Sequence, residues 1–178
     1  MISREEIAGF YDIYGKELFV YIYRYAGAHE PAEDMLQDTF VRLIAYSEKK
    51  DISSDNIRAL LYSIARSVCI DYSRKKKFRR ETVLDEGAEQ NIPDPHTNGD
   101  NPLDEFIEDY LMRSKEPGKT ILLLRRQGKT FEFIAEATGI PLRTVKRRAA
   151  EVLEDLRCRL RSAGFLRDNG MNSGSGTL

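Results

Sequence analysis

The sequence is poor in the residues that build metal centres and disulfide frameworks. It has two histidines and two cysteines among 178 residues. Cys69 and Cys158 lie far apart, each on or near the apolar side of a predicted helix, so we expect two reduced core thiols and no metal site. No apolar run approaches the ~20 residues that span a bilayer, and the N-terminus does not resemble a signal peptide. These absences predict a cytoplasmic protein.

Two further absences bear on function class and fold. The sequence contains no paired carboxylates, nucleophile–base set or phosphate-cradling glycine loop, so we expect neither an enzyme nor a cofactor. It also lacks the alternation typical of strands. We predict an all-α fold of two small helical domains joined by a flexible acidic linker. The predicted parts are an N-terminal helical domain (residues 1–81), a linker (82–101), a helix-turn-helix domain (102–162) and a disordered tail (163–178).

The net charge of −1 conceals separate blocks of opposite sign. Residues 57–80 contain eight basic residues and one acidic residue, and residues 117–178 contain 12 basic and six acidic residues. Residues 1–56 and 81–116 each contain 11 acidic residues. This segregation indicates two surfaces that face nucleic acid and acidic segments that face something else.

Helical periodicity predicts three helices in the N-terminal domain. The first carries an apolar stripe from Ile7 to Tyr25 and ends at Gly27, where a left-handed backbone suits glycine. The second begins at Glu30-Pro31, and its expected buried side consists of Leu36, Phe40, Leu43 and Ile44. The third runs from about Ile57 to Arg80.

The C-terminal domain contains the pattern of a helix-turn-helix. Thr130 is placed to cap a short helix over residues 131–138, and Gly139 follows as the turn. A second helix after Pro141 carries an expected apolar stripe of Val145, Ala149, Val152, Leu153, Leu156 and Leu160. Its N-terminal part, which enters the major groove in this motif, is rich in hydrogen-bond donors. The predicted DNA contacts are Arg143, Thr144, Lys146, Arg147 and Arg148; the alternative is a helical hairpin with a solvated charged face.

A second basic cluster ends the third helix. Basic residues mixed with Tyr62, Tyr72 and Phe78 suit single-stranded nucleic acid, which needs phosphate neutralisation and ring stacking together. The alternative is a solvated helix end, where cations also suit the helix dipole. The predicted nucleic-acid contacts are Arg66, Arg74, Lys75, Lys76, Lys77, Arg79 and Arg80.

The order of these motifs resembles the extracytoplasmic-function (ECF) group of bacterial RNA polymerase sigma factors. The segment from Glu33 to Phe40 (EDMLQDTF) is similar to the family's polymerase-docking helix. Segments 59–66 (ALLYSIAR) and 70–76 (IDYSRKK) resemble its helix for opening the minus-ten element, and segment 139–146 (GIPLRTVK) resembles the start of its minus-thirty-five reading helix. The resemblance implies polymerase contacts by Asp34, Gln37, Asp38 and Phe40.

The resemblance also implies three partners: core RNA polymerase, promoter DNA and an anti-sigma factor. The chain departs from the family's usual residues at Leu60 (tryptophan), Ser67 (asparagine), Phe133 (glutamate) and Arg143 (glycine). Phe133 also removes the capping-box partner of Thr130. Two other hypotheses remain open: a sigma-like decoy that sequesters an anti-sigma factor, and a helix-turn-helix regulator that acts without polymerase.

Overall fold

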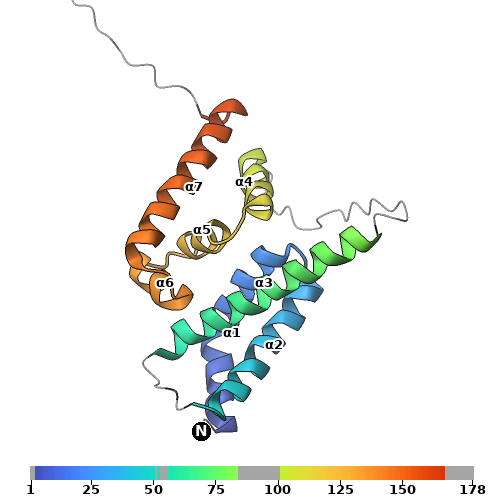
Figure 1. The fold of residues 1–178 in the computed structure, drawn as a ribbon, viewed down its shortest axis with the longest axis vertical. Coiled ribbons are helices and arrows are strands. Elements are labelled where there is room, and N and C mark those ends of the chain that lie inside the picture. The colour runs from blue at the N-terminus through green and yellow to red at the C-terminus, as the bar shows by residue number, and fades with distance from the viewer. Residues whose placement is uncertain (1–2, 51, 53–55, 84–100, 167–178) are drawn as a thin grey trace, which may run out of the picture.

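The computed structural model describes residues 3–50, 52, 56–83 and 101–166, and every regular element in these ranges is a helix (Figure 1). The all-α prediction is therefore confirmed. Most of the predicted linker and tail falls on residues 84–100 and 167–178, which lie outside the described ranges. Within those ranges, no helix combines the length and apolarity needed to cross a bilayer.

The N-terminal domain consists of α1 (Arg4–Ala26), α2 (His29–Ser47) and α3 (Ile57–Val83). Ser3 and Glu6 form a capping box at the start of α1, and Gly27 ends the helix with a φ of 75°. The three helices pack pairwise around buried side chains that include Leu18, Ile22, Leu36, Leu43, Leu61 and Ala65. The predicted burial of Ile44 is wrong: it is 40% exposed, because Leu43 occupies the core and the next residue lies about 100° further round the helix.

The C-terminal domain consists of α4 (Pro102–Arg113), α5 (Gly118–Arg126), α6 (Phe131–Thr138) and α7 (Leu142–Ser162). The Thr130 hydroxyl accepts a hydrogen bond from the Phe133 amide at 3.1 Å, and Gly139 turns the chain with a φ of 68°. The predicted helix-turn-helix is thus present in α6 and α7. Its core contains Ile121, Leu123, Leu124, Ile134, Val145 and Ala149. Leu153, which we expected on the buried stripe, is 40% exposed at the stripe's edge.

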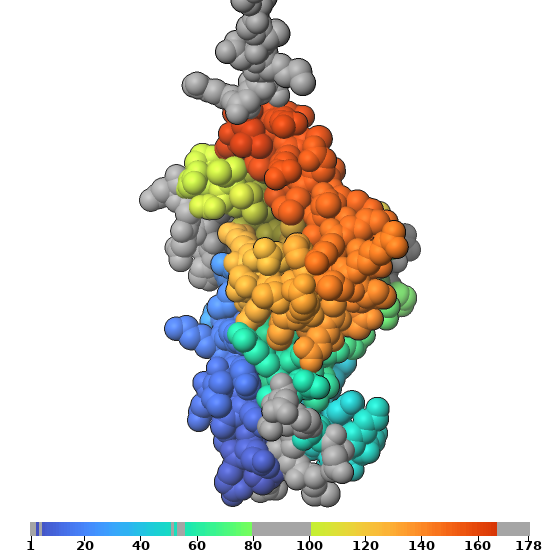
Figure 2. Space-filling view, turned by 90° about the vertical axis from the view of Figure 1, so that its left-hand side faces the viewer, coloured from blue at the N-terminus to red at the C-terminus, as the bar shows by residue number. Residues whose placement is uncertain are grey.

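The two domains pack directly against each other. Helix α3 contacts α6, and α1 contacts both α4 and α5. In Figure 2 the yellow-to-orange C-terminal domain rests on the blue-to-green N-terminal domain. Buried apolar residues of both domains also belong to one continuous cluster. The sequence had indicated two domains at the ends of a flexible linker, without any sign of this contact.

Candidate nucleic-acid interface

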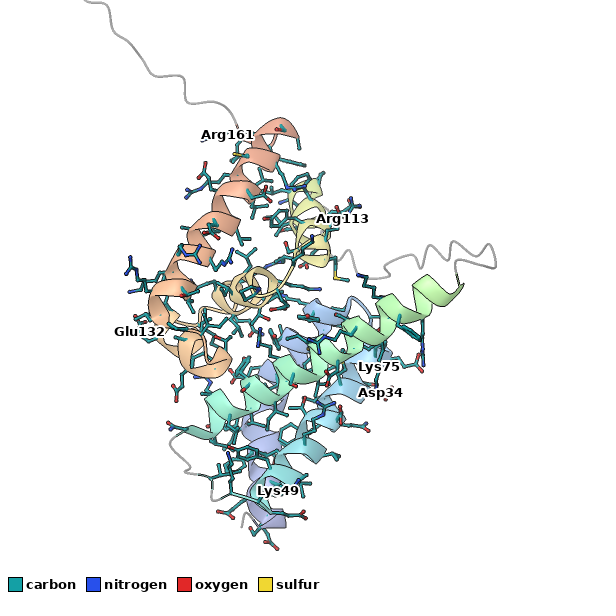
Figure 3. The ribbon with its side chains drawn as sticks, in the orientation of Figure 1. Asp34, Lys49, Lys75, Arg113, Glu132 and Arg161 are labelled. Atoms are coloured by element: carbon teal, nitrogen blue, oxygen red, sulfur yellow. The ribbon has the colours of Figure 1, made fainter. Side chains whose placement is uncertain are left out.

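The N-terminal half of α7 presents a basic surface on a firmly anchored helix. Val145 and Ala149 are buried in the domain core, whereas Arg143, Lys146 and Arg147 are exposed and Thr144 is half-buried. Lys146 lies 3.7 Å from Glu132 of α6, which is labelled in Figure 3. Exposed ion pairs of this kind contribute about 0–1 kcal/mol, so phosphates or bases can replace them at little cost.

Arg148 occupies a different part of α7 from the other predicted contacts. It is exposed and bonded to Glu151 at 2.9 Å, and it lines a groove between α4 and α7 together with Asp155 and Arg159. Arg147 shares Glu151 as a partner, at 2.7 Å. The structure therefore places Arg148 at the border of the basic surface of α7, next to carboxylates.

The basic end of α3 forms a second exposed cluster. Arg74, Lys75, Lys77 and Arg79 are exposed, and Phe78 among them is 70% exposed. Lys76 is half-buried, with its Nζ 5.9 Å from the centroid of the Tyr72 ring. The side chain of Arg80 lies outside the described residues. Cations and two rings thus share this end of the helix.

Two residues predicted with that cluster lie elsewhere. Tyr62 is 1% exposed and packs between the two domains. Arg66 also faces the other domain, with Nη2 3.6 Å from Glu116 Oε2 and only about a quarter of each side chain exposed. The Nε of Arg66 is buried and has no hydrogen-bond partner. In this conformation Arg66 is thus separated from the exposed basic end of α3, and its contact with nucleic acid stays a prediction.

The predicted polymerase-binding residues of α2 divide into exposed and buried groups. Asp34 and Gln37 are exposed. Phe40 is buried, with 7% of its surface exposed, and its ring centroid lies 5.1 Å from that of Tyr11. Asp38 is half-buried and bonds Arg42 at 3.0 Å, and Arg42 in turn bonds Asp71 of α3 at 2.9 Å.

The exposed apolar surface on α2 comes from other residues than Phe40. Val41 is 61% exposed and, like Ile44, lies on the helix downstream of Gln37. The polar end of α2 adjoins the basic end of α3, since Asp34, Asp38, Lys75 and Arg79 line one groove between the two helices. Asp34 and Lys75, which both line this groove, are labelled in Figure 3.

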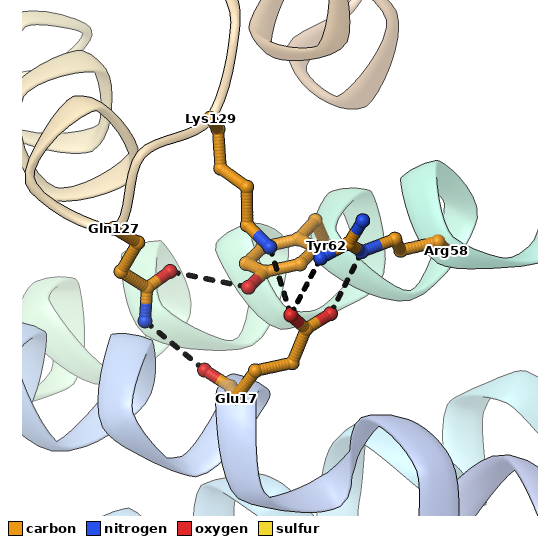
Figure 4. Close-up of polar contacts among 5 residues, drawn as sticks. All are labelled: Glu17, Arg58, Tyr62, Gln127 and Lys129. Atoms are coloured by element: carbon orange, nitrogen blue, oxygen red, sulfur yellow. Dashed lines mark hydrogen bonds and ion pairs between the residues drawn. The ribbon is translucent and has the colours of Figure 1, made fainter.

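An ionic and aromatic cluster joins the domains at Glu17 (Figure 4). The Glu17 carboxylate accepts two hydrogen bonds from Arg58 of α3, at 2.9 and 2.7 Å, and one from Lys129 Nζ at 2.8 Å. Gln127 donates to the Glu17 carbonyl at 3.1 Å and accepts from the Tyr62 hydroxyl at 3.1 Å. Burial opposes ionisation of Glu17, but the hydrogen bonds from Arg58 and Lys129 outweigh it and lower the pKa of the carboxyl group. Sequence analysis missed this cluster.

The two cysteines differ in environment. Cys69 is fully buried in α3, and burial raises its pKa, whereas Cys158 is exposed on α7. The prediction of two core thiols is therefore wrong for Cys158, which lies beyond the edge of the buried stripe. Among the described residues, no group of three or more His, Cys, Asp or Glu side chains is arranged to hold a metal ion.

Comparison with known proteins assigns the chain to a family. Residues 10–79 match the sigma-70 region 2 family. The chain is 31% identical over 151 residues to the RNA polymerase sigma factor YlaC of Bacillus subtilis, covering 82% of this chain and 86% of that protein. It is 30% identical over 161 residues to the ECF RNA polymerase sigma factor SigL of Mycobacterium tuberculosis, covering 88% and 90%.

The chain belongs to the ECF group of RNA polymerase sigma factors, and its function is in transcription initiation. The fold is also similar to that of the sigma factor RpoE in its complex with the anti-sigma factor NepR from Bartonella quintana. That likeness has a TM-score of 0.68 at 21% identity and covers 88% of this chain and 98% of the other. The family prediction made from the motifs is confirmed.

Proposed function

We propose that this sigma factor binds core RNA polymerase through α2 and directs it to promoters with α7 and the basic end of α3. The observation that carries the proposal is the construction of α7. Its buried Val145 and Ala149 fix the helix, while Arg143, Lys146 and Arg147 project from its N-terminal half. Donors at this end of an anchored recognition helix reach base edges and phosphates in the major groove.

The exposed face of α2 suits a protein partner. Asp34 and Gln37 offer polar contacts, and Val41 and Ile44 offer apolar area on the same exposed side. A mixture of polar and apolar groups is typical of protein–protein interfaces. Phe40 supports this face from the core, since its ring is buried against Tyr11.

The basic end of α3 suits the opened strand of the minus-ten element. Arg74, Lys75, Lys77 and Arg79 supply charge for phosphates, and the exposed Phe78 ring supplies a surface on which a base can stack. An anti-sigma factor is a further proposed partner. The complex of RpoE with NepR supports it, because that protein shares the fold of this chain. We propose that the protein acts in the cytoplasm and that it catalyses no reaction itself.

The decisive experiment is a pull-down with purified core RNA polymerase, followed by run-off transcription from a pool of genomic promoter fragments. We expect binding and selective transcripts from the wild type, and loss of both in an Asp34→Ala/Gln37→Ala variant. Asp104→Ala removes an exposed carboxylate from α4 and is the matched control. Binding without transcripts would indicate that strand-opening residues are missing. Absence of polymerase binding would favour the decoy, or an independent regulator if promoter binding persists.

The reading surface of α7 has its own test. Arg147→Ala should weaken promoter binding by about 1–3 kcal/mol if Arg147 contacts a base, measured by competition between promoter and scrambled minus-thirty-five sequences. A loss that is uniform across sequences assigns Arg147 to a phosphate. Arg157→Ala, on the same helix and 63% exposed at its side chain, should leave the affinity unchanged. Equal effects of the two substitutions would remove Arg147 from the interface.

A further inference from the structure

We propose that the free protein is closed by its own C-terminal domain, which covers the N-terminal half of α3, and that Glu17 holds this closed contact together. The closed contact consists of Glu17, Arg58 and Tyr62 on the N-terminal domain and Gln127, Lys129 and Phe133 on the C-terminal domain. It goes beyond the proposed function, and only its consequence for promoter opening rests on that function.

The contact is built around one cation buried between rings. Lys129 is 8% exposed, and its Nζ lies 5.0 Å from the Tyr62 ring centroid and 5.5 Å from that of Phe133. The Tyr62 and Phe133 rings meet at 90° with centroids 5.4 Å apart, an edge-to-face geometry that aromatic pairs favour. Lys129 therefore lies in the seam between the two domains rather than on a solvated surface.

The Glu17 carboxylate offsets the cost of burying the Lys129 ammonium group. A buried ammonium is costly unless it is paired and hydrogen-bonded, and Lys129 is bonded to Glu17 at 2.8 Å. Arg58 contacts the same carboxylate and also lies 5.5 Å from the Phe133 ring centroid. Removing the carboxylate would leave two cations close together without an anion between them, and separation of the domains would return the buried Lys129 to water.

A second group of contacts closes the same seam further along α1. Lys119 of α5 is 6% exposed, and its Nζ donates to the Tyr25 carbonyl at 3.0 Å and lies 4.1 Å from the Tyr25 ring centroid. Thr120 bonds the Tyr21 hydroxyl at 3.2 Å. Helices α5 and α6 are therefore held on the N-terminal domain at two places, and a thermal opening must break both.

Closure affects the two DNA-facing elements differently. Tyr62 and Arg66, in the segment that resembles the minus-ten helix, are turned into the seam. Arg143, Lys146 and Arg147 of α7 stay exposed. The closed protein can thus present its reading helix while part of its strand-opening helix is covered. Release of the C-terminal domain would expose Tyr62 and Arg66 together.

Distance measurements between spin labels on the full chain test the proposal. The exposed Cys158 carries one label and a Lys49→Cys substitution carries the other, while the buried Cys69 escapes labelling. Lys49 and the end of α7, marked by Arg161, lie in different domains near opposite ends of the molecule (Figure 3). We expect a narrow distance distribution for the wild type and a broad one for Glu17→Ala. Glu136→Ala, an exposed carboxylate of α6, is the matched control and should keep the narrow distribution.

Two further variants guard against a folding defect, with helix content checked by circular dichroism. Lys129→Glu perturbs the contact from the other domain and should also broaden the distribution. Combining it with Glu17→Lys should narrow the distribution again, because opposite charges then face each other once more. An unchanged distribution in both Glu17→Ala and Lys129→Glu would overturn the role of Glu17 in closure.

Adding core RNA polymerase to the labelled wild type tests the opening. We expect the distance distribution to change on binding, which would show that the closed contact separates in the complex. Polymerase binding with an unchanged distribution would overturn the opening. Failure to bind polymerase would instead count against the proposed function, while the comparison of free variants would still decide closure.

Discussion

Replacing Gly118 with alanine tests how tightly α5 packs on α7, and the structure predicts the sign of the effect. Gly118 is the first residue of α5 and is buried. A Cβ at this position would lie 2.7 Å from Val152 Cγ2, closer than two carbon atoms can approach. Valine in a helix has one strongly preferred χ1 rotamer, so rotating it away from the new methyl group is itself costly.

Two opposing terms set the magnitude. Alanine in place of glycine normally stabilises a helix by about 0.5–1 kcal/mol, and the φ of Gly118 is not among the positive ones, so the backbone allows the change. Overpacking by an extra methyl group costs about 1–3 kcal/mol. We therefore expect Gly118→Ala to lower the free energy of unfolding by about 1–2 kcal/mol.

Urea unfolding of a double-mutant cycle gives the measurement. In a Val152→Ala background the obstructing methyl group is gone, and Gly118→Ala should become stabilising by about 0.5–1 kcal/mol. Gly9→Ala is the control, because Gly9 lies inside α1 and a Cβ added there would meet no atom within 4 Å; it should stabilise by a similar amount. An equal loss from Gly118→Ala in both backgrounds would refute the steric argument.

Three further predictions concern the core, the thiols and pH. Phe40→Ala should lower the free energy of unfolding by about 3–5 kcal/mol in a urea titration, as expected for a buried ring and not for a surface contact; a stable variant that fails only in polymerase binding would contradict this. A thiol reagent should modify Cys158 alone in the native protein and Cys69 as well in denaturant, and rapid native reaction of both would contradict the burial of Cys69. The folded-state pKa of Glu17 is lowered, so the stabilisation that Glu17 provides is present above its unfolded pKa of ~4.3 and is lost as pH falls through the folded value. The distribution of spin-label distances should therefore broaden over that acidic range. An unchanged distribution there would count against the role of Glu17 in closure.

Local signals in the sequence were sufficient for the helix-turn-helix. The predicted short helix, residues 131–138, has the bounds of α6, and Thr130 and Gly139 form its two ends as expected. Each of these features depends on residues within a few positions of one another, so capping and glycine chemistry determine them directly. The anchoring of α7 by Val145 and Ala149 follows in the same way from helical periodicity.

The closed contact could not be predicted, because its partners are distant in sequence and charged. Glu17 and Lys129 are separated by 112 positions, and periodicity assigns such residues to a solvated face. Periodicity also does not fix the width of a buried stripe, which is why Ile44 and Leu153 proved exposed. Phe133 was recognised only as a departure from the family's usual glutamate. The structure gives its ring a position against Tyr62.

The closed contact and the basic surface of α7 lie on different segments of the C-terminal domain, and this separation defines where chimaeras with relatives can be joined. Every residue of that domain in the closed contact precedes Gly139, whereas the basic surface of α7 follows Pro141. Helix α7 packs on α5 and α6 of its own domain. If α7 reads promoter DNA as proposed, a graft that exchanges only residues 142–148, with Val145 retained, should transfer sequence preference while leaving the seam between the domains intact. A graft joined upstream of Gln127 would transfer both properties together.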